Sequence, residues 1–89
     1  MRELQVTSQF KKDLKRAKKH LKDLSKLERI LDKLVSNQVL EPKNRPHRLA
    51  GDWRPCWECH IEPDWLLIWD EDEASVTLIR TGTHSDLFD

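Results

Sequence analysis

Two apolar stripes at helical spacing occupy the first half of the chain, and they limit its fold more than any other feature. The first stripe repeats at steps of four, three, four and three residues: Phe10, Leu14, Ala17, Leu21 and Leu24. Such spacing predicts one apolar face of an α-helix. Ser8 precedes the stripe and is a suitable N-terminal cap.

A second stripe follows after a short break: Leu27, Ile30, Leu31, Leu34 and Val35. Ser25 and Glu28 have the spacing of a capping box, which predicts that this helix begins near Lys26. Asn37 is a suitable C-terminal stop. The two stripes therefore predict two antiparallel helices joined as a hairpin, and each helix needs another element to cover its apolar side.

The rest of the chain has the pattern of strands and turns. Residues 41–47, EPKNRPH, hold two prolines and no helical period, which predicts a basic loop. Short apolar or alternating segments predict strands at 2–6, 53–61, 65–69 and 75–81, with turns at 50–52 and 70–73. Residues 83–89 suit a closing helical turn capped by Thr83 or Ser85. We therefore expect one α+β domain over residues 1–89, of order β-α-α-β-β-β, with both helices on one face of a small antiparallel sheet.

Charge is unevenly distributed along the chain, although the net charge is zero. Residues 1–48 hold fourteen Lys or Arg against six Asp or Glu, whereas residues 49–89 hold two against ten. This asymmetry predicts a surface for a polyanion, but a solvated lysine-rich helix explains it equally well. No segment approaches the ~20 apolar residues of a membrane span, and the start lacks the apolar core of a signal peptide. With two cysteines in such a chain, we expect a cytoplasmic protein with free thiols.

The segment CWECH at residues 56–60 has the C-x-x-C-H spacing of a haem c attachment site. On a strand, residues three apart point to opposite faces, so Cys56 and Cys59 do not reach the same ring edge. The only methionine is the first residue, so the Met/His ligation of cytochromes c is lacking. Structural zinc needs four ligands, usually as two local pairs, and only one cysteine pair is present. We expect no haem, no metal and no cofactor, which leaves His60 for another role.

Strand parity predicts that His60 lies close to other polar residues. In an antiparallel meander, the end of the first strand, the start of the second and the end of the third share one rim of the sheet. This rim is predicted to gather His60, Asp64, Arg80 and residues 83–84. If residues 50–52 form a hairpin turn, His47 lies near the same rim.

Histidines with a carboxylate and an arginine suit RNA cleavage without a metal. Histidine, with a pKa of ~6.5, serves as either acid or base at neutral pH. One group must remove the ribose 2′-OH proton, and another must protonate the departing 5′ oxygen. Asp64 is suited to orient an imidazole, Arg80 to hold the phosphate, and Phe88 to stack on an unpaired base. Structural roles are the alternatives: a turn residue for Asp64, a cross-strand pair with Glu58 or Glu62 for Arg80, and a core position for Phe88.

Two segments, HIEPDWLLIW at 60–69 and RTGTHSDLF at 80–88, closely resemble the hallmark sequences of YafQ-type toxins in the RelE superfamily. The similarity continues through PHRLAGDW at 46–53 and the lysine-rich hairpin, so it spans essentially the whole chain. The resemblance implies the toxin of a type II toxin–antitoxin system. It also implies a ribosome-dependent mRNA endonuclease that a cognate antitoxin inhibits.

The resemblance implies particular site residues as well. The positions that match the family's catalytic residues are His47, His60, Asp64 and His84. By analogy, His84 is the general acid, His60 or Asp64 is the base, and His47 assists orientation or phosphate binding. Contacts to RNA or phosphate are expected from Arg48, Arg80 and Phe88. Because the chain is neutral overall, the RNA must contact the helices and residues 43–48, and the acidic turn at 70–73 must face away.

Three other functions compete with the nuclease. The first is a non-nucleolytic toxin of the same fold, such as a gyrase poison, in which the rim histidines have no role. The second is an RNA-binding regulator that uses the basic helices and does not cut. The third is a metal-binding protein that uses histidine and cysteine. The resemblance favours the nuclease.

Overall fold

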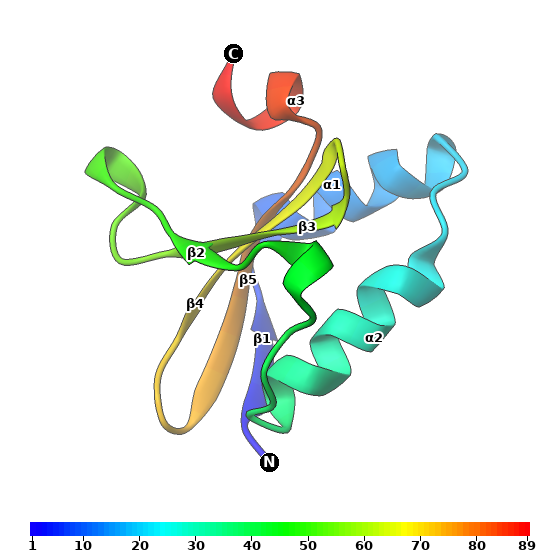
Figure 1. The fold of residues 1–89 in the computed structure, drawn as a ribbon. Coiled ribbons are helices and arrows are strands. Elements are labelled where there is room, and N and C mark those ends of the chain that lie inside the picture. The colour runs from blue at the N-terminus through cyan, green and yellow to red at the C-terminus, as the bar shows by residue number, and fades with distance from the viewer.

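The computed structural model describes all residues, 1–89, and shows an α+β fold, which confirms the predicted class. Figure 1 shows the elements, which follow one another as β1 (Glu3–Val6), α1 (Ser8–Lys19), α2 (Leu24–Val35), β2 (His47–Arg48), β3 (Trp57–Glu62), β4 (Trp65–Glu71), β5 (Ser75–Gly82) and α3 (His84–Phe88). Two short 3-10 turns, Pro42–Asn44 and Gly51–Trp53, flank β2. The predicted order therefore lacks only the two-residue strand β2. None of the helices combines the length and the apolar character that crossing a membrane requires.

The five strands form one sheet in the order β1-β5-β4-β3-β2. Strands β2 to β5 pair antiparallel with their neighbours, as the meander prediction requires. Strand β1 instead pairs parallel with β5, and Glu3 lies opposite Ser75. The sheet is therefore mostly antiparallel, as predicted, and only this edge strand runs parallel to its neighbour, because the sequence pattern does not specify its direction.

Helices α1 and α2 cover the same face of the sheet, as predicted. Their buried side chains share one core cluster with alternate residues of the central strand β4. On the helices, the members of this cluster are Phe10, Ala17, Leu27, Ile30 and Leu34, and on β4 they are Trp65, Leu67 and Trp69. Because each fully buried large apolar side chain stabilises the fold by about 1.5–3 kcal/mol, this face holds most of the core.

The N-terminal caps of both helices differ from the prediction by one or two residues. Thr7, not Ser8, caps α1, and its Oγ1 accepts a hydrogen bond of 2.9 Å from the backbone N–H of Phe10. Asp23, not Ser25, caps α2, since its Oδ1 accepts a 3.0 Å bond from the Ser25 backbone N–H. Thr7 and Ser8 are both residues that can cap a helix, and so are Asp23 and Ser25, so the sequence alone does not decide which residue of each pair is the cap.

The helix ends are set by residues in the left-handed conformation. Leu21, a predicted member of the first stripe, lies beyond the end of α1 with φ of 57° and is 90% exposed. Leu24 belongs to the first turn of α2. Asn37 follows α2 with φ of 55°, which confirms its predicted role as a stop. The first stripe therefore combines residues of two helices.

The strand boundaries shift at both ends of the β3–β4 region. β3 begins at Trp57 rather than at residue 53, because residues 51–53 form a 3-10 turn and Pro55 has no N–H for a ladder. β4 continues to Glu71, whose carboxylate accepts hydrogen bonds from Arg2 and from the Trp69 indole. The acidic turn therefore shortens to residues 72–74. Figure 1 shows this turn at the end of the sheet away from α3.

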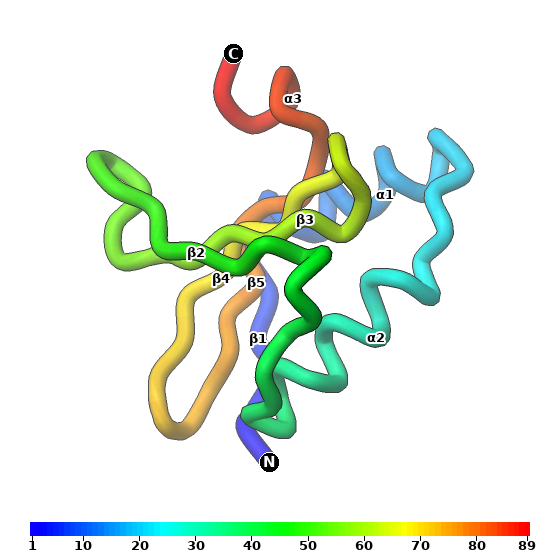
Figure 2. The backbone as a smooth tube through the Cα atoms, in the orientation of Figure 1, coloured from blue at the N-terminus to red at the C-terminus, as the bar shows by residue number.

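The second face of the sheet is covered only in part. A smaller cluster joins Leu66 and Ile68 of β4 to Leu87 of α3, so the C-terminal helix packs over this face. In Figure 2 the C-terminus and α3 lie at one end of the molecule, and the N-terminus lies at the other end. Of the predicted histidines, His47 and His60 lie on this face of the sheet, and His84 begins α3.

The two cysteines point to opposite faces of the sheet, as expected for residues three apart. Cys59 is fully buried in the helix-side core, whereas Cys56 packs against the smaller cluster on the other face. Both thiols are free, and burial raises the pKa of Cys59 to about 12. Cys59 is therefore a core residue without reactivity at neutral pH.

Candidate active site

His60 lies near the end of β3 on the face that α1 and α2 leave open. Its neighbours Cys59 and Ile61 belong to the helix-side core, so alternation turns the imidazole to the opposite face. His60 pairs across the ladder with Leu66, a member of the second cluster. Nδ1 of His60 donates to the Pro63 carbonyl oxygen at 3.2 Å. A neutral imidazole held in this way has its lone pair on Nε2, and this nitrogen is free to accept a proton.

His84 begins α3, directly after β5. Thr83 and Asp86 form a capping box: the Asp86 N–H donates to Thr83 Oγ1 at 3.1 Å, and the Thr83 N–H donates to Asp86 Oδ2 at 3.0 Å. This confirms Thr83 among the two predicted caps. Gly82 permits the tight junction, because a Cβ at this position would lie 2.9 Å from the Cβ of Asp86. The cap therefore fixes where His84 enters the site.

Asp64 holds the imidazole of His84. Its Oδ1 accepts two hydrogen bonds from this residue, one from the backbone N–H at 3.0 Å and one from Nδ1 at 2.6 Å. The backbone bond, then the imidazole bond, holds the pKa of Asp64 below its ordinary value. An ionised carboxylate only accepts, so Nδ1 of His84 carries the proton of this bond, and Nε2 is the ring nitrogen that Asp64 does not hold.

The imidazoles of His60 and His84 face each other across the rim. Their ring centroids lie 5.9 Å apart, and the ring planes are tilted by 49°. Both rings are held at Nδ1, one by a carbonyl oxygen and the other by a carboxylate. Two imidazoles that keep Nε2 free at this separation can act on two atoms of one bound substrate.

His47 reaches the same face from β2, next to Glu58 of β3. The two residues are paired in the ladder, and Nε2 of His47 lies 3.0 Å from Oε1 of Glu58. Glu58 is a residue that the sequence prediction missed as part of the site. It is only 5% exposed, and its Oε2 has no hydrogen-bond partner. Its position two residues before His60 on a strand was the signal that places both on one face.

One group of donor atoms in this site has a spacing suited to a metal ion. The group comprises His47, Glu58 and His60, whose ligand atoms all lie within 4.8 Å of one another. Two imidazole nitrogens and a carboxylate oxygen are ligands that zinc and other transition metals accept. The expectation that no metal binds remains a prediction at this position.

Arg80 lies beside the site, but its predicted cross-strand partners are wrong. Arg80 is paired with Ile68 of β4, Ile68 with Glu58 of β3, and Glu58 with His47 of β2, so the four residues form one row across the sheet. Residues of one row point to the same face, which places Arg80 on the open face. The guanidinium forms an ion pair with Asp13 of α1, and Nε lies 2.8 Å from Oδ2. Neither Glu58 nor Glu62 contacts it, since Glu62 instead pairs with Lys22 and Lys26.

Phe88 and Arg48 have different positions relative to the imidazoles. Phe88 ends α3 and is 44% exposed, with its ring 5.9 Å from that of Trp53, so it is neither fully buried nor free. Arg48 lies over the ring of Trp57 at 5.0 Å and is paired with it in the ladder. Trp57 packs against the helix-side core, so Arg48 lies on the face opposite His47. The structure does not bring Arg48 into the site, because adjacent residues on a strand point to opposite faces.

A basic groove runs from α2 to the His60 end of the rim. It has a volume of about 810 Å³ and is open to solvent. Its cationic residues come from α2 and from the loop before β2: Lys26, Arg29, Lys33, Lys43 and Arg45. His60 and Pro63 line the same groove, so the groove extends to the end of β3 that carries His60. The carboxylates in the groove are those of Asp32, Glu41 and Glu62.

The fold and the rim define a small α+β protein whose histidines are arranged for acid–base chemistry beside a cationic groove. A sequence model of the YafQ toxins, bacterial toxins of type II toxin–antitoxin systems, matches residues 2–89. The chain belongs to this family.

Several relatives share the sequence and the fold over nearly their whole length. The chain is 36% identical to the mRNA interferase toxin YafQ of Escherichia coli strain K12, over 98% of this chain and 96% of that protein. A crystal structure of the E. coli DinJ–YafQ toxin–antitoxin complex matches with a TM-score of 0.92 at 36% identity, covering 99% of this chain and 98% of that one. A crystal structure of a metal-bound toxin from Helicobacter pylori matches with a TM-score of 0.93 at 37% identity, covering 99% and 100%.

Proposed function

We propose that this protein is the toxin of a type II toxin–antitoxin system and that it cleaves messenger RNA on the ribosome by metal-free acid–base catalysis. The observation that carries the proposal is the facing pair of imidazoles, His60 and His84, 5.9 Å apart. Membership of the YafQ family supports it, because the E. coli relative is an mRNA interferase toxin.

In the proposed reaction, His60 is the base and His84 is the acid. Nε2 of His60 takes the proton of the ribose 2′-OH, and the 2′ oxygen attacks the phosphorus. The bond from phosphorus to the 5′ oxygen breaks, and His84, acting as an imidazolium that keeps its Nδ1 proton bonded to Asp64, gives that oxygen the proton of Nε2. The products are a 2′,3′-cyclic phosphate and a free 5′-OH. Asp64 is bonded to the opposite nitrogen of His84, so its proposed role is to orient the acid rather than to act as the base.

Three more residues are assigned to contacts with the phosphate and with a nucleobase of the RNA. Arg80 is proposed to neutralise the charge that develops on the phosphate. His47, whose Nε2 lies 3.0 Å from Glu58 Oε1 and whose Nδ1 lies 3.3 Å from the Arg48 carbonyl oxygen, is proposed to assist orientation or phosphate binding. Phe88 is proposed to stack on an unpaired base, since 44% of its surface remains exposed at the end of α3.

The proposed partners are a cognate antitoxin, messenger RNA and the ribosome. The E. coli YafQ relative is crystallised with DinJ in a toxin–antitoxin complex, which supports an antitoxin for this chain. The basic groove offers the cationic surface that a polyanion or an acidic antitoxin segment requires. We propose that the protein acts in the cytoplasm, where translated messages are found.

The proposed function is tested by inducing the protein without an antitoxin and mapping the 5′ ends of cellular messages. Wild-type protein is expected to arrest growth and to create new 5′ ends within translated regions, and His84→Ala is expected to create none. Intact messages during growth arrest would instead indicate a non-nucleolytic toxin. Binding of RNA without cleavage or arrest would indicate a regulator.

Metal ions are expected to inhibit this nuclease rather than to activate it. EDTA should leave the cleavage rate unchanged, because acid, base and charge stabilisation all come from side chains. Zn²⁺ should slow cleavage by occupying His47, Glu58 and His60, whose ligand atoms lie within 4.8 Å of one another. The similar structures of a metal-bound toxin and of a copper-bound mutant toxin from H. pylori support such a site. A thermal shift with Zn²⁺ should accompany inhibition, and His47→Ala should lose it. Loss of cleavage in EDTA would contradict the prediction.

Charge reversal in the groove is expected to weaken RNA binding in a salt-dependent way. Arg29→Glu and Lys33→Glu each alter a cation that lines the groove. Each phosphate that a cationic side chain neutralises makes the slope of log affinity against log salt more negative by about 0.7 for single strands. Each variant should therefore make this slope less negative by about the same amount. The measurement is fluorescence anisotropy of a labelled oligoribonucleotide with His84→Gln, which should bind without cutting. Lys15→Glu, an exposed residue of α1 outside the groove, is the matched control. Equal losses for all three variants would show that the groove is not the RNA path.

A further inference from the structure

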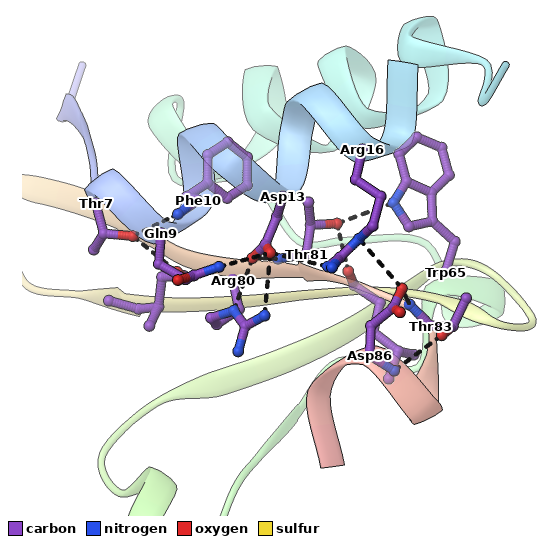
Figure 3. Close-up of polar contacts among 12 residues, drawn as sticks. Thr7, Gln9, Phe10, Asp13, Arg16, Trp65, Arg80, Thr81, Thr83 and Asp86 are labelled. Carbon is purple, nitrogen blue, oxygen red and sulfur yellow. Dashed lines mark hydrogen bonds and ion pairs between the residues drawn. The ribbon is translucent and has the colours of Figure 1, made fainter. Parts of the chain in front are cut away.

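Asp13 is a buried carboxylate in the middle of the lysine-rich helix α1. It is 2% exposed and lies on the inner face of the helix, between Phe10 and Ala17. Figure 3 shows polar groups converging on it from α1 and β5. The donors to its two oxygens are Gln9 Nε2 at 3.1 Å, Arg16 Nη2 at 3.0 Å, Arg80 Nε at 2.8 Å, Arg80 Nη2 at 3.1 Å and the Thr81 backbone N–H at 3.2 Å.

The end of strand β1 explains why Asp13 reaches these groups. β1 pairs with β5 only as far as Val6 opposite Leu78. Thr7 then turns the chain into α1, and its hydroxyl donates to the Ile79 carbonyl oxygen at 2.8 Å. The edge of β5 beyond this point is covered by α1 instead of a strand. Asp13 therefore accepts from the edge N–H of Thr81 and, at the same time, from the side chain before it.

The geometry of the ion pair leaves part of the arginine free. Asp13 binds the edge of the Arg80 guanidinium formed by Nε and Nη2, in a bidentate arrangement. Nη1 has no partner in the protein, and the Arg80 side chain is 22% exposed. A guanidinium is a rigid planar fork, so fixing one edge also fixes the direction of the other. The free edge belongs to a residue in the same ladder row as Glu58 and His47, on the face that carries the imidazoles.

We propose that Asp13 is a positioning residue for the nuclease: its carboxylate holds Arg80 so that the free edge of the guanidinium meets the scissile phosphate. This inference rests on the proposed function, in which Arg80 contacts the phosphate. Asp13 does not touch the substrate and acts only through Arg80. Burial disfavours the charge of Asp13, but the bonds from Arg80, Gln9 and Thr81 outweigh it and hold the pKa of Asp13 below its ordinary value. The pair therefore stays ionised in the pH range where imidazoles exchange protons.

The test is a double-mutant cycle on the rate of cleavage. Single-turnover rates at saturating RNA are measured for wild type, Asp13→Asn, Arg80→Ala and the double variant. Arg80→Ala should slow cleavage about 10²- to 10³-fold, and Asp13→Asn about 10²-fold, because a displaced guanidinium misses the phosphate. The double variant should be no slower than Arg80→Ala, since nothing remains to position. Gln9→Ala, which removes a neighbouring donor to Asp13, should cleave at nearly the wild-type rate.

Three outcomes overturn the inference. If Asp13→Asn slows cleavage equally with and without Arg80, Asp13 supports the fold and nothing else. If Arg80→Ala cleaves like wild type while His84→Ala does not, the nuclease proposal stands and the positioning role fails. If wild type cuts no RNA, on or off the ribosome, both proposals fail together.

A second experiment keeps Asp13 intact, in case Asp13→Asn does not fold. Guanidinium ion is added to Arg80→Ala at concentrations far below those that denature proteins. It should restore part of the activity, because the Asp13 carboxylate still offers its bidentate site. Methylammonium, which has the same charge without the planar fork, should restore much less. Equal effects of the two cations would overturn the inference.

Discussion

His84→Ala should lower the rate of RNA cleavage about 10²- to 10⁴-fold, the usual contribution of one acid–base group. The loss is expected because Nε2 of His84 is the only proposed source of the proton for the 5′ oxygen. The measurement is single-turnover cleavage of a labelled RNA by purified toxin, with translating ribosomes added. A substrate with a sulfur in place of the bridging 5′ oxygen should restore most of the rate, because a thiolate leaves without protonation. Such rescue distinguishes a lost acid from a lost binding contact.

The fold of this variant should be unchanged. The His84 side chain is 55% exposed, and its contacts are the Nδ1 bond to Asp64 and the approach of the ring to His60. The backbone bond to Asp64 does not need the side chain. His20→Ala, at the exposed end of α1, is the control histidine and should cleave normally. If His84→Ala cleaves like wild type, the assignment of the acid is wrong.

The position of the histidines was predictable because it follows from strand direction. Antiparallel strands that alternate up and down bring their ends together, and this places His60, Asp64 and His84 at one rim whatever the details of the turns. The same parity predicts which neighbours are separated, and the structure separates Cys56 from Cys59. It also separates Arg48 from His47, which the prediction of Arg48 as a site residue overlooked.

Buried carboxylates were harder to predict, because their environment depends on contacts far along the chain. In the sequence, Asp13 is surrounded by lysines of a predicted helix, and this pattern indicates a charged residue on the surface. Its partner Arg80 is 67 residues away, and the ion pair exists only because α1 covers the edge of β5. The available signal was its place on the inner face, three residues after Phe10 and four before Ala17. Glu58 gave a similar signal, two residues before His60 on the same strand.

Trp65→Ala should destabilise the protein by about 3–5 kcal/mol, which is a large part of the 5–15 kcal/mol typical of a folded domain. Trp65 is the first residue of β4 and is 1% exposed beneath the helices. Truncation leaves a cavity in the helix-side core and removes the bond of 3.0 Å from the indole N–H to Thr81 Oγ1. The measurement is urea unfolding at equilibrium, followed by circular dichroism.

A second substitution separates the cavity from the lost hydrogen bond. Trp65→Phe keeps most of the apolar volume but removes the indole N–H, so it should cost less than Trp65→Ala, with about 1 kcal/mol from the lost bond. Thr81 Oγ1 still donates to the Leu66 carbonyl oxygen at 2.6 Å and is not left unpaired. Because the Thr81 N–H also bonds to Asp13, the core under Trp65 and the anchor of Arg80 share one segment of β5. Trp65→Phe should therefore lower the rate of cleavage only slightly. If it lowers this rate as much as Trp65→Ala does, the hydrogen bond rather than the packing holds this segment of β5 in place.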